Sequence, residues 1–403
     1  MKYNFEREVD RSGTNAVKWE LIQDSQDPLN WKFTEQFYGD DRILPMWVAD
    51  MDFRCPQPVI DALVGRAEHG IYGYSAPTKP YFASVVGWMH RRHGWKVQPE
   101  WISTTPGVVP AIYTMVHTFS APGEKVLVQP PVYYPFFSAI QENDRELVTN
   151  PLVFESGRYR MDYADLEEKL KDPKVKMAIL CNPHNPVGRV WSRDELVRFG
   201  EICLQNDVLV VADELHGDLI LKNHIFTPFA TVSDSLAQQA VICTAPSKTF
   251  NLAGLHTSNI IIPDAEKRAK FDRTLRNNGL FGLGVFGIDA LQAAYNEGET
   301  WLQELLVYIE GNLERLEDFI CNHIPQISVV RPEGTYLVWL DCRRLELDKW
   351  ELKRLMLQEA RVYLDDGFIF GDEGDGFVRI NIACPRSILT EALERIKSAI
   401  AQL

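Results

Sequence analysis

"VICTAPSKTFNLAGLHTSN", residues 241–259, places a lysine directly after an apolar run. The run at 240–246 has the composition of a buried strand, and Lys248 follows at its carboxyl end. Lysines beside turns are mostly solvated surface groups, so this position alone does not identify a site. Its interpretation depends on which residues follow the neighbouring apolar runs.

Short apolar runs alternate with amphipathic stretches from about residue 100 to residue 290. Each run is short enough for one strand, and they lie at 125–129, 176–182, 208–214, 240–246 and 258–263. Ser192 with Glu195 three residues later is a capping-box pattern that predicts a helix over 192–206. Strands that are buried on both faces and separated by helices indicate an α/β fold with a mainly parallel sheet.

The pattern changes after about residue 290, where it becomes that of an α+β domain with fewer strands. The elements expected there are a helix at 300–322, a strand at 335–341, a helix near 348–360, a strand at 377–383 and a closing helix. The first 50 residues are too irregular for a sheet core. We therefore predict an N-terminal segment at 1–50 that packs with the small domain, a large domain at 51–290 and a small domain at 291–403.

The composition excludes several classes of protein. The 403 residues are 45% hydrophobic, which allows a large core, and the net charge of −14 opposes binding to nucleic acids or anionic membranes. Seven scattered cysteines without CxxC spacing argue against disulfide or zinc sites, so no metal is expected. Because no signal core or membrane-spanning run is present, we expect a cytoplasmic protein.

Four residues follow the ends of apolar runs or open the next helix: Gly107, Asn182, Asp213 and Lys248. Ligands of open parallel sheets bind outside the carboxyl ends of the strands, where these residues would meet. Each also has an ordinary explanation. Asp213 could cap the next element, Asn182 could mark an Asn-Pro turn, and Gly107 could be a loop glycine before a helix. Their joint occurrence in one sheet predicts a ligand site.

A single cofactor chemistry accounts for all four. Burial lowers the hydration of a lysine ammonium, and the resulting amine can form a Schiff base with an aldehyde. A pyridine aldehyde also needs a carboxylate for its ring nitrogen, a donor for its ring oxygen and a pocket for its phosphate. Asp213, Asn182 and the Gly107 turn meet these needs, with Ser247 as a further donor. The glycine-rich run at 282–287 follows a predicted helix rather than a strand, which argues against a dinucleotide site.

The motifs "NPHNPVG", "DELH" and "SKTFN" occur in this order, and the sequence resembles the fold-type I pyridoxal-phosphate enzymes of the aspartate aminotransferase superfamily. With "LPMWVADMDF", "GIYGYS", "QPPVYYPF" and "APSKTFNLAG", it is similar to the MalY/PatB-type cystathionine β-lyases, or C-S lyases, over nearly the whole chain. The resemblance implies a large domain with a mainly parallel seven-stranded sheet, a smaller α+β domain and pyridoxal 5'-phosphate as cofactor.

The resemblance also implies roles for particular residues. Lys248 would carry the cofactor, Asp213 would pair with the ring nitrogen, Asn182 would contact the ring oxygen and Tyr133 would stack on the ring. Tyr133 could instead be a core or turn aromatic, and Tyr134 beside it leaves the register open. The remaining assignments are Gly107, Val108, Val109, Ser247 and His216 to the cofactor, Arg379, Ala49 and Asn182 to the substrate, and Tyr74 to the phosphate of a neighbouring subunit in a homodimer.

Two positions depart from the wider superfamily. His216 replaces a tyrosine three residues after the aspartate, and His256 replaces an arginine eight residues after the lysine. Losing that arginine removes a fixed positive charge from the phosphate pocket, so backbone amides, Ser247 and Tyr74 would hold the phosphate. Either histidine could also be structural. Without the resemblance, Arg379 would be interpreted as a solvated residue on the outer face of a strand.

The reaction expected from the resemblance is β-elimination from L-cystathionine, L-cysteine or another S-substituted cysteine. Lys248 would remove the α-proton, and the products would be a thiol, pyruvate and ammonia. The residues alone do not distinguish this reaction from transamination, which uses the same lysine. An aminotransferase is therefore the alternative, and a regulatory protein that retains the fold is a second.

Overall fold

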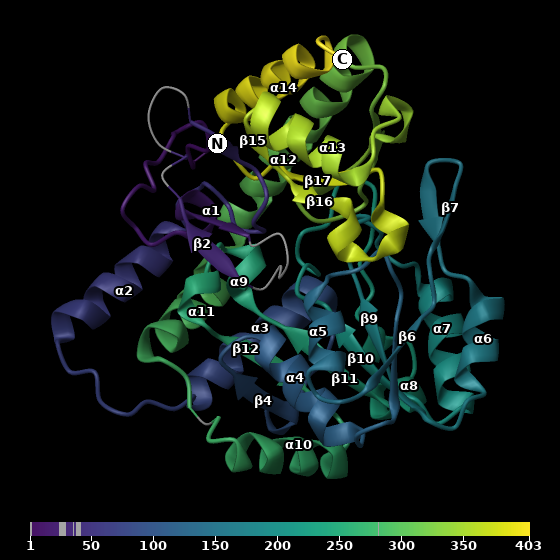
Figure 1. Ribbon diagram of the computed structural model, residues 1–403. Coiled ribbons are helices and arrows are strands. Elements are labelled where there is room, and N and C mark those ends of the chain that lie inside the picture. The colour runs from purple at the N-terminus through teal and green to yellow at the C-terminus, as the bar shows by residue number, and fades with distance from the viewer. Residues whose placement is uncertain (1, 24–29, 35, 38–41, 281) are drawn as a thin grey trace.

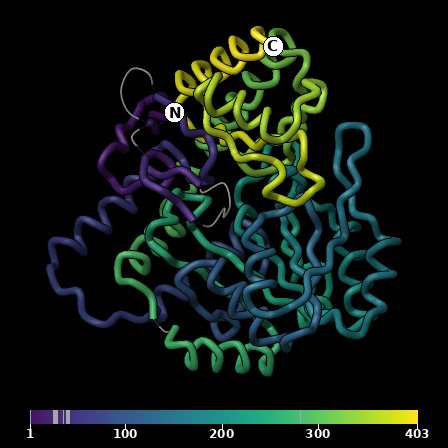
Figure 2. The backbone as a smooth tube through the Cα atoms, in the orientation of Figure 1, coloured from purple at the N-terminus to yellow at the C-terminus, as the bar shows by residue number. Residues whose placement is uncertain are grey.

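The computed structural model describes residues 2–23, 30–34, 36–37, 42–280 and 282–403. Figure 1 shows the large sheet and its helices in the lower part, with the C-terminal helices and a smaller sheet above them. The backbone trace in Figure 2 shows the N-terminal segment running beside the C-terminal part. None of the helices in the described ranges is long and apolar enough to cross a bilayer.

The large sheet has seven strands in the order β4-β12-β11-β10-β9-β5-β6. Their bounds are Ile102–Thr105 (β4), Ser258–Ile261 (β12), Ala240–Thr244 (β11), Leu209–Asp213 (β10), Val175–Cys181 (β9), Lys125–Val128 (β5) and Glu146–Thr149 (β6). β12 is antiparallel to both of its neighbours, and the other pairs are parallel. The predicted mainly parallel seven-stranded sheet is confirmed.

Both faces of this sheet are buried. In β10, Val210 and Ala212 belong to one apolar cluster, while Leu209 and Val211 belong to another on the opposite face. Helices cover the faces, as a parallel sheet requires. They are α2 (Gln57–His69), α3 (Lys79–His93), α4 (Val108–Phe119), α5 (Pro135–Gln141), α6 (Tyr163–Leu170), α7 (Arg193–Gln205), α8 (Asp234–Gln238), α10 (Ala265–Asn277) and α11 (Val285–Glu297).

Local signals set the ends of these helices. The predicted capping box at the start of α7 is formed, because the Glu195 N–H donates to Ser192 Oγ at 3.3 Å and the Ser192 N–H donates to Glu195 Oε2 at 2.8 Å. The glycine-rich run at 282–287 follows α10 and continues into the first turn of α11, so the element that precedes it is a helix and not a strand.

The C-terminal part begins with α12 (Glu299–His323) and contains a four-stranded antiparallel sheet. The sheet consists of β13 (Ser328–Val330), β14 (Leu337–Asp341), β17 (Phe377–Asn381) and β16 (Asp365–Asp366), and its helices include α13 (Lys349–Arg354) and α14 (Arg386–Ile400). The N-terminal strand β3 (Leu44–Pro45) pairs in parallel with β15 (Val362–Tyr363). The domain boundaries at 50 and 290 stay a prediction, and residues 1, 24–29, 35 and 38–41 of the first segment lie outside the described ranges.

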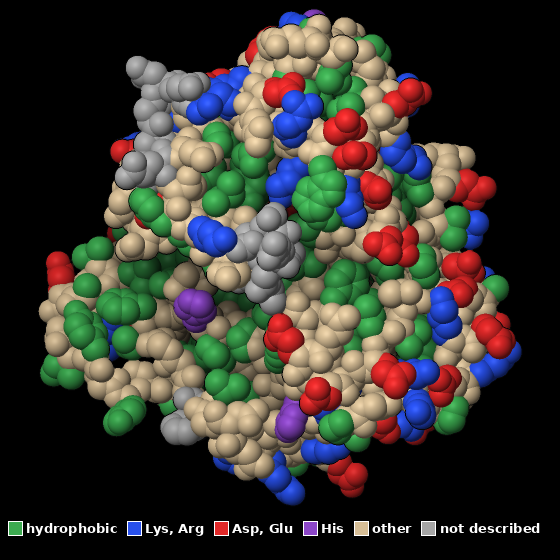
Figure 3. Space-filling model, in the orientation of Figure 1, with side chains coloured by type: hydrophobic (Ala, Val, Ile, Leu, Met, Phe, Trp, Pro, Cys, Tyr) green, Lys and Arg blue, Asp and Glu red, His purple; other side chains and the backbone are tan. Residues whose placement is uncertain are grey.

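Shorter elements complete the fold. They are α1 (Val17–Glu20), β1 (Leu21–Gln23), β2 (Trp31–Phe33), the hairpin of β7 (Val153–Glu155) and β8 (Arg158–Arg160), and α9 (Pro246–Thr249). On the face shown in Figure 3, acidic side chains lie among basic ones, and a hollow with apolar walls opens below the centre left.

Candidate active site

A cavity of about 280 Å³ lies where β9, β10 and β11 end and α4 begins. Most of the residues predicted from the sequence line it. The lining residues are Ala49, Pro106, Gly107, Val108, Val109, Pro110, Tyr133, Cys181, Asn185, Asp213, Leu215, His216, Ser247, Lys248, Ala253, His256 and Thr257. The strand ends therefore bring together side chains from six separate stretches of the chain.

Lys248 lies on α9, one turn after the end of β11. Its Nζ donates a hydrogen bond of 2.7 Å to the carbonyl oxygen of Ala49. Burial lowers the pKa of Lys248 to about 8, and the charges of Asp50 and Asp213 only partly oppose this change. About a tenth of the molecules therefore carry a free Lys248 amine at pH 7, which is the form that a nucleophile or a base requires.

Asp213 ends β10 and is buried beside the cavity. Burial raises its pKa to about 6, against the hydrogen bond from the Leu215 N–H to Oδ1 at 3.2 Å and the charge of Lys248. No other hydrogen bond to this carboxylate is present among the described residues. A cationic N–H donor placed in the cavity would stabilise the ionised form.

Tyr133 lines the same cavity between β5 and α5, and burial raises its pKa to about 12. Its ring makes an edge contact with Phe136 at 5.6 Å between centroids. The hydroxyl of Tyr134 instead accepts a hydrogen bond from Gln23 Nε2 at 3.2 Å, and Tyr134 does not line the cavity. Of the two adjacent tyrosines between which the sequence left the choice open, Tyr133 is therefore the one that lines the cavity.

Asn182 does not occupy the place that the sequence suggested. Its Nδ2 donates to the carbonyl of Thr227 at 3.3 Å, and its Oδ1 accepts from the Trp191 N–H at 3.2 Å, so its side chain is used to brace the turn after β9. Asn185, three residues later, lines the cavity instead. The structure therefore places the second asparagine of "NPHNPVG" in the cavity lining and not the first, to which the sequence assigned the cofactor and substrate contacts.

Arg379 lies on β17 and is 3% exposed, which excludes a solvated outer face. Its Nη1 donates to Asn185 Oδ1 at 2.8 Å, and its Nη2 donates to the carbonyl of Trp47 at 3.0 Å and to Asp365. Its Nε has no hydrogen-bond partner within the described part of the chain. The guanidinium therefore contacts Asn185, which lines the cavity, and its Nε–H remains available as a donor.

One end of the cavity is formed by backbone. Gly107 precedes α4 with φ of 137°, a conformation that favours glycine. The first turn of α4 points its unpaired N–H groups at this end, where an anion is favoured by both the donors and the helix dipole. Val108, Val109, Ser247 and His256 also line the cavity.

His216 and Tyr74 differ in position. His216 is buried in the cavity wall, its Nδ1 has no partner among the described residues, and burial lowers its pKa well below the usual value. It is therefore a neutral imidazole at neutral pH. Tyr74 is fully exposed between α2 and α3 and does not line this cavity.

A family profile for aminotransferase class I and II matches residues 55–396. The chain belongs to this family. Cystathionine beta-lyase PatB of Bacillus subtilis (strain 168) is 47% identical over 398 residues, which are 99% of this chain and 100% of PatB. The predicted family and fold class are confirmed.

Two solved structures agree closely with the fold. A PLP-bound putative aminotransferase from Clostridium difficile 630 has a TM-score of 0.92 at 44% identity, covering 99% of this chain and 100% of that one. Cystalysin from Treponema denticola, whose structure contains a pyridoxal 5'-phosphate cofactor, has a TM-score of 0.93 at 38% identity over the full length of both chains. This member of the aminotransferase class I and II family therefore shares its whole architecture with cofactor-containing proteins.

The sequence did not indicate several residues of the site. Asn185 could have been found from the repeated Asn-Pro in its motif. Tyr336, whose hydroxyl donates to the carbonyl of Ala49 at 2.8 Å, comes from the C-terminal part and carries no local signal. Cys181, near the end of the run at 176–182, and Thr257, just before the run at 258–263, also line the cavity, although these runs were interpreted only as strands.

Proposed function

We propose that this chain is a pyridoxal 5'-phosphate-dependent carbon–sulfur β-lyase that cleaves L-cystathionine, and L-cysteine or other S-substituted cysteines, to a thiol, pyruvate and ammonia. The observation that carries the proposal is the buried Lys248 amine sharing one cavity with Asp213, in a chain 47% identical to PatB over its full length. The lyase prediction agrees with these relatives.

The residues present fit this cofactor. The unpaired oxygen of Asp213 and the open N-terminus of α4 are polar groups at the cavity without a partner among the described residues. His216, whose buried Nδ1 is also unpaired there, lines the same cavity. A pyridinium N–H would satisfy Asp213, and a phosphate would satisfy the α4 amides. We assign Asn185 and Tyr133 to the ring, with Gly107, Val108, Val109, Ser247 and His256 at the phosphate.

The proposed chemistry divides among a few side chains. When bound, the cofactor supplies a conjugated ring that accepts the electron pair left on the substrate α-carbon. Arg379 and Asn185 orient the substrate carboxylate, for which a planar guanidinium is suited. Nζ of Lys248 takes the α-proton, since its lowered pKa leaves it partly unprotonated, and the resulting ammonium can return a proton to the departing sulfur. Asp213 stays ionised and balances the positive ring nitrogen.

Incubation with L-cystathionine and the cofactor, without a keto acid, tests this function. A lyase releases thiol and pyruvate continuously, whereas an aminotransferase stops after about one turnover because its cofactor is not regenerated. Borohydride reduction followed by peptide mapping should place the label on Lys248. The Lys248→Ala variant should lose both label and activity, and Lys96→Ala, at an exposed lysine, should lose neither. A label on another residue would contradict the proposal.

We further propose that the enzyme is a homodimer in which Tyr74 reaches the phosphate of the partner subunit. Its full exposure in the single chain, together with exposed Ile71 and Tyr72 on the same loop, supports this arrangement. The cytoplasm remains the expected compartment, in keeping with seven free cysteines, of which five are buried.

A further inference from the structure

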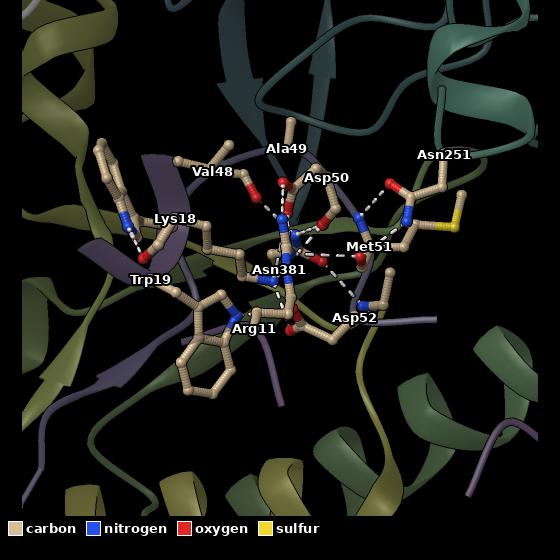
Figure 4. A network of polar contacts seen from close by, with 12 residues as sticks. Arg11, Lys18, Trp19, Val48, Ala49, Asp50, Met51, Asp52, Asn251 and Asn381 are labelled. Atoms are coloured by element: carbon tan, nitrogen blue, oxygen red, sulfur yellow. Dashed lines mark hydrogen bonds and ion pairs between the residues drawn. The ribbon is translucent and has the colours of Figure 1, made fainter. Parts of the chain in front are cut away.

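Residues 48–53, here called the strap, contact Lys248 through Ala49, which also lines the cavity. The carbonyl oxygen of Ala49 in the strap accepts two hydrogen bonds, one from Lys248 Nζ at 2.7 Å and one from the Tyr336 hydroxyl at 2.8 Å. Figure 4 shows the strap held by side chains from both sides. A backbone carbonyl at this distance accepts a hydrogen bond from an ammonium group. A Schiff base nitrogen without a proton has no hydrogen to donate to it.

One side of the strap is held by Asn251, three residues after Lys248. Its Oδ1 accepts from the Met51 N–H at 2.9 Å, and its Nδ2 donates to the carbonyls of Met51 at 2.8 Å and Phe53 at 2.9 Å. Asn251 has φ of 59°, a left-handed conformation that asparagine tolerates better than most residues. The loop that carries the lysine is thus tied to the strap through three hydrogen bonds from one side chain (Figure 4).

The other side of the strap is held by Asn381, two residues after Arg379 on β17. Its Nδ2 donates to the carbonyls of Val48 and Asp50, both at 2.6 Å, so it brackets Ala49. Its Oδ1 accepts from the Ala383 N–H at 2.8 Å, which fixes the orientation of the amide. With its neighbours on both sides held, the Ala49 carbonyl has little freedom to turn.

Ion pairs fix the acidic side chains of the strap. Lys18 Nζ donates to Asp52 Oδ2 at 2.7 Å, the Trp19 indole N–H donates to Asp52 Oδ1 at 2.8 Å, and Arg11 contacts both Asp50 and Asp52 (Figure 4). Burial opposes the ionisation of Asp52, but the charges of Lys18 and Arg11 outweigh it and hold its pKa below the usual value. The strap is therefore held by three groups of contacts, from Asn251, from Asn381 and from the N-terminal residues Arg11, Lys18 and Trp19.

We propose that Asn251 and Asn381 are positioning residues, which fix the strap so that the Ala49 carbonyl receives the Lys248 ammonium whenever this nitrogen is not joined to the cofactor. The proposal rests on the function proposed above, in which Lys248 is freed, takes a proton from the substrate α-carbon and holds it. The Ala49 carbonyl stabilises the protonated form at that stage. The two asparagines set how well it does so without touching substrate or cofactor.

The test uses the protein without cofactor, where Lys248 is free. Trace labelling with acetic anhydride modifies only unprotonated amines, so the labelling of Lys248 against pH, followed by peptide mass spectrometry, reports its protonation midpoint. Asn251→Gly removes the three bonds but keeps the left-handed backbone, which glycine adopts freely. We expect the midpoint to fall by about one pH unit, because a hydrogen bond to the charged form is lost. Of the other charged groups that act on Lys248, Asp213 and Arg379 lie outside the strap. Asp50 lies within it, but its carboxylate stays paired with Arg11.

Asn223→Gly is the matched control. Asn223 also has a left-handed backbone, with φ of 70°, but it is exposed and remote from the strap in sequence. It should leave the Lys248 midpoint unchanged. A midpoint that is unchanged or raised in Asn251→Gly would overturn the proposal. Asn381→Ala, which acts from the opposite side, should also lower the midpoint and decides the matter if the first variant does not fold.

Activity of the cofactor-loaded variants separates this proposal from the proposed function. Both asparagine variants should lower kcat about tenfold and change KM less than twofold, since proton transfer and not binding is affected. If the unaltered protein shows no lyase activity but the Lys248 midpoint still falls in Asn251→Gly, the positioning role stands and the proposed function is refuted. A lyase whose midpoint does not move would refute the positioning role alone.

Discussion

Asn185 Oδ1 accepts a hydrogen bond of 2.8 Å from Arg379 Nη1, although the two residues are 194 positions apart in the chain. The first follows β9 of the large sheet, and the second lies on β17 of the C-terminal sheet. The bond therefore joins the two parts of the molecule at the cavity. It also places a neutral acceptor against a buried cation, so the orientation of each side chain depends on the other.

Replacing Asn185 and Asn182 separately tests which asparagine serves the site. Asn185→Ala should lower kcat/KM by about tenfold or more and shift the absorption of the bound cofactor, because it removes a contact in the cavity. Asn182→Ala should leave the spectrum unchanged and lower the free energy of unfolding by about 1–3 kcal/mol, because the Trp191 N–H loses its acceptor. The reverse pattern would restore the assignment of Asn182.

Arg379→Lys should raise KM for L-cystathionine by about 10- to 100-fold and change kcat less. Lysine keeps the charge but cannot make the planar, two-pronged contact with a carboxylate. Steady-state kinetics and a titration with a substrate analogue that lacks the carboxylate provide the measurement. The analogue should bind the variant and the original enzyme equally well, and a difference between them would indicate general damage.

Asp213→Asn should stabilise the cofactor-free protein at pH 7.5 while abolishing catalysis. The folded-state pKa of Asp213 is raised to about 6 from 3.8, so the folded state binds more protons than the unfolded state between these pH values. Burial of this carboxyl therefore does not lower the free energy of unfolding below pH 3.8. It lowers it progressively between pH 3.8 and 6, and by a constant amount above about pH 6. The expected gain above pH 6 is about 3 kcal/mol.

Thermal unfolding of the two cofactor-free proteins at several pH values measures this difference. It should shrink toward zero as the pH falls from 7 to 4, because Asp213 is then protonated in the folded state. Equal stabilities at pH 7.5 would show that the carboxyl is not strained by burial. Asparagine retains an oxygen for the Leu215 N–H, so that bond is preserved in the comparison.

Tyr74→Ala and Lys248→Ala should each inactivate the enzyme alone, but a mixture of the two should regain activity. In a mixed dimer, one site would combine the intact Lys248 of one subunit with Tyr74 of the partner subunit. Random pairing makes half of the dimers mixed, each with one intact site of two, so about a quarter of the original activity should return. Co-expression followed by an assay provides the test. No recovery would show that Tyr74 serves its own subunit or no site at all.

The sequence indicated the buried strands better than the edges of the sheet. Five strands were found because their runs are apolar on both faces, whereas β4 ("ISTT") and β6 ("ELVT") are short, polar and lie at the two edges. Edge strands have one neighbour and need less apolar surface. Periodicity alone therefore could not reveal them.

The site was predicted to the level of the strand ends and no further. Asp213 and Lys248 follow directly from the ends of β10 and β11, because the last residues of parallel strands share an edge. Asn185 was missed because the direction of its side chain is set by a turn. Tyr336 and Asn251 were missed because their partners in the strap are distant in sequence, and no local pattern records such contacts.

The strap lies near the N-terminus, but one of the residues that hold it lies near the C-terminus. Val48 leaves the ribosome early, but its carbonyl is fixed by Asn381, which lies 333 positions later. A nascent chain therefore cannot fix the strap beside Lys248 until translation has almost ended. A polypeptide truncated before β17 that still folded its large sheet would hold the lysine in place yet lack both the fixed carbonyl opposite it and Arg379, so unfinished molecules would release thiols poorly.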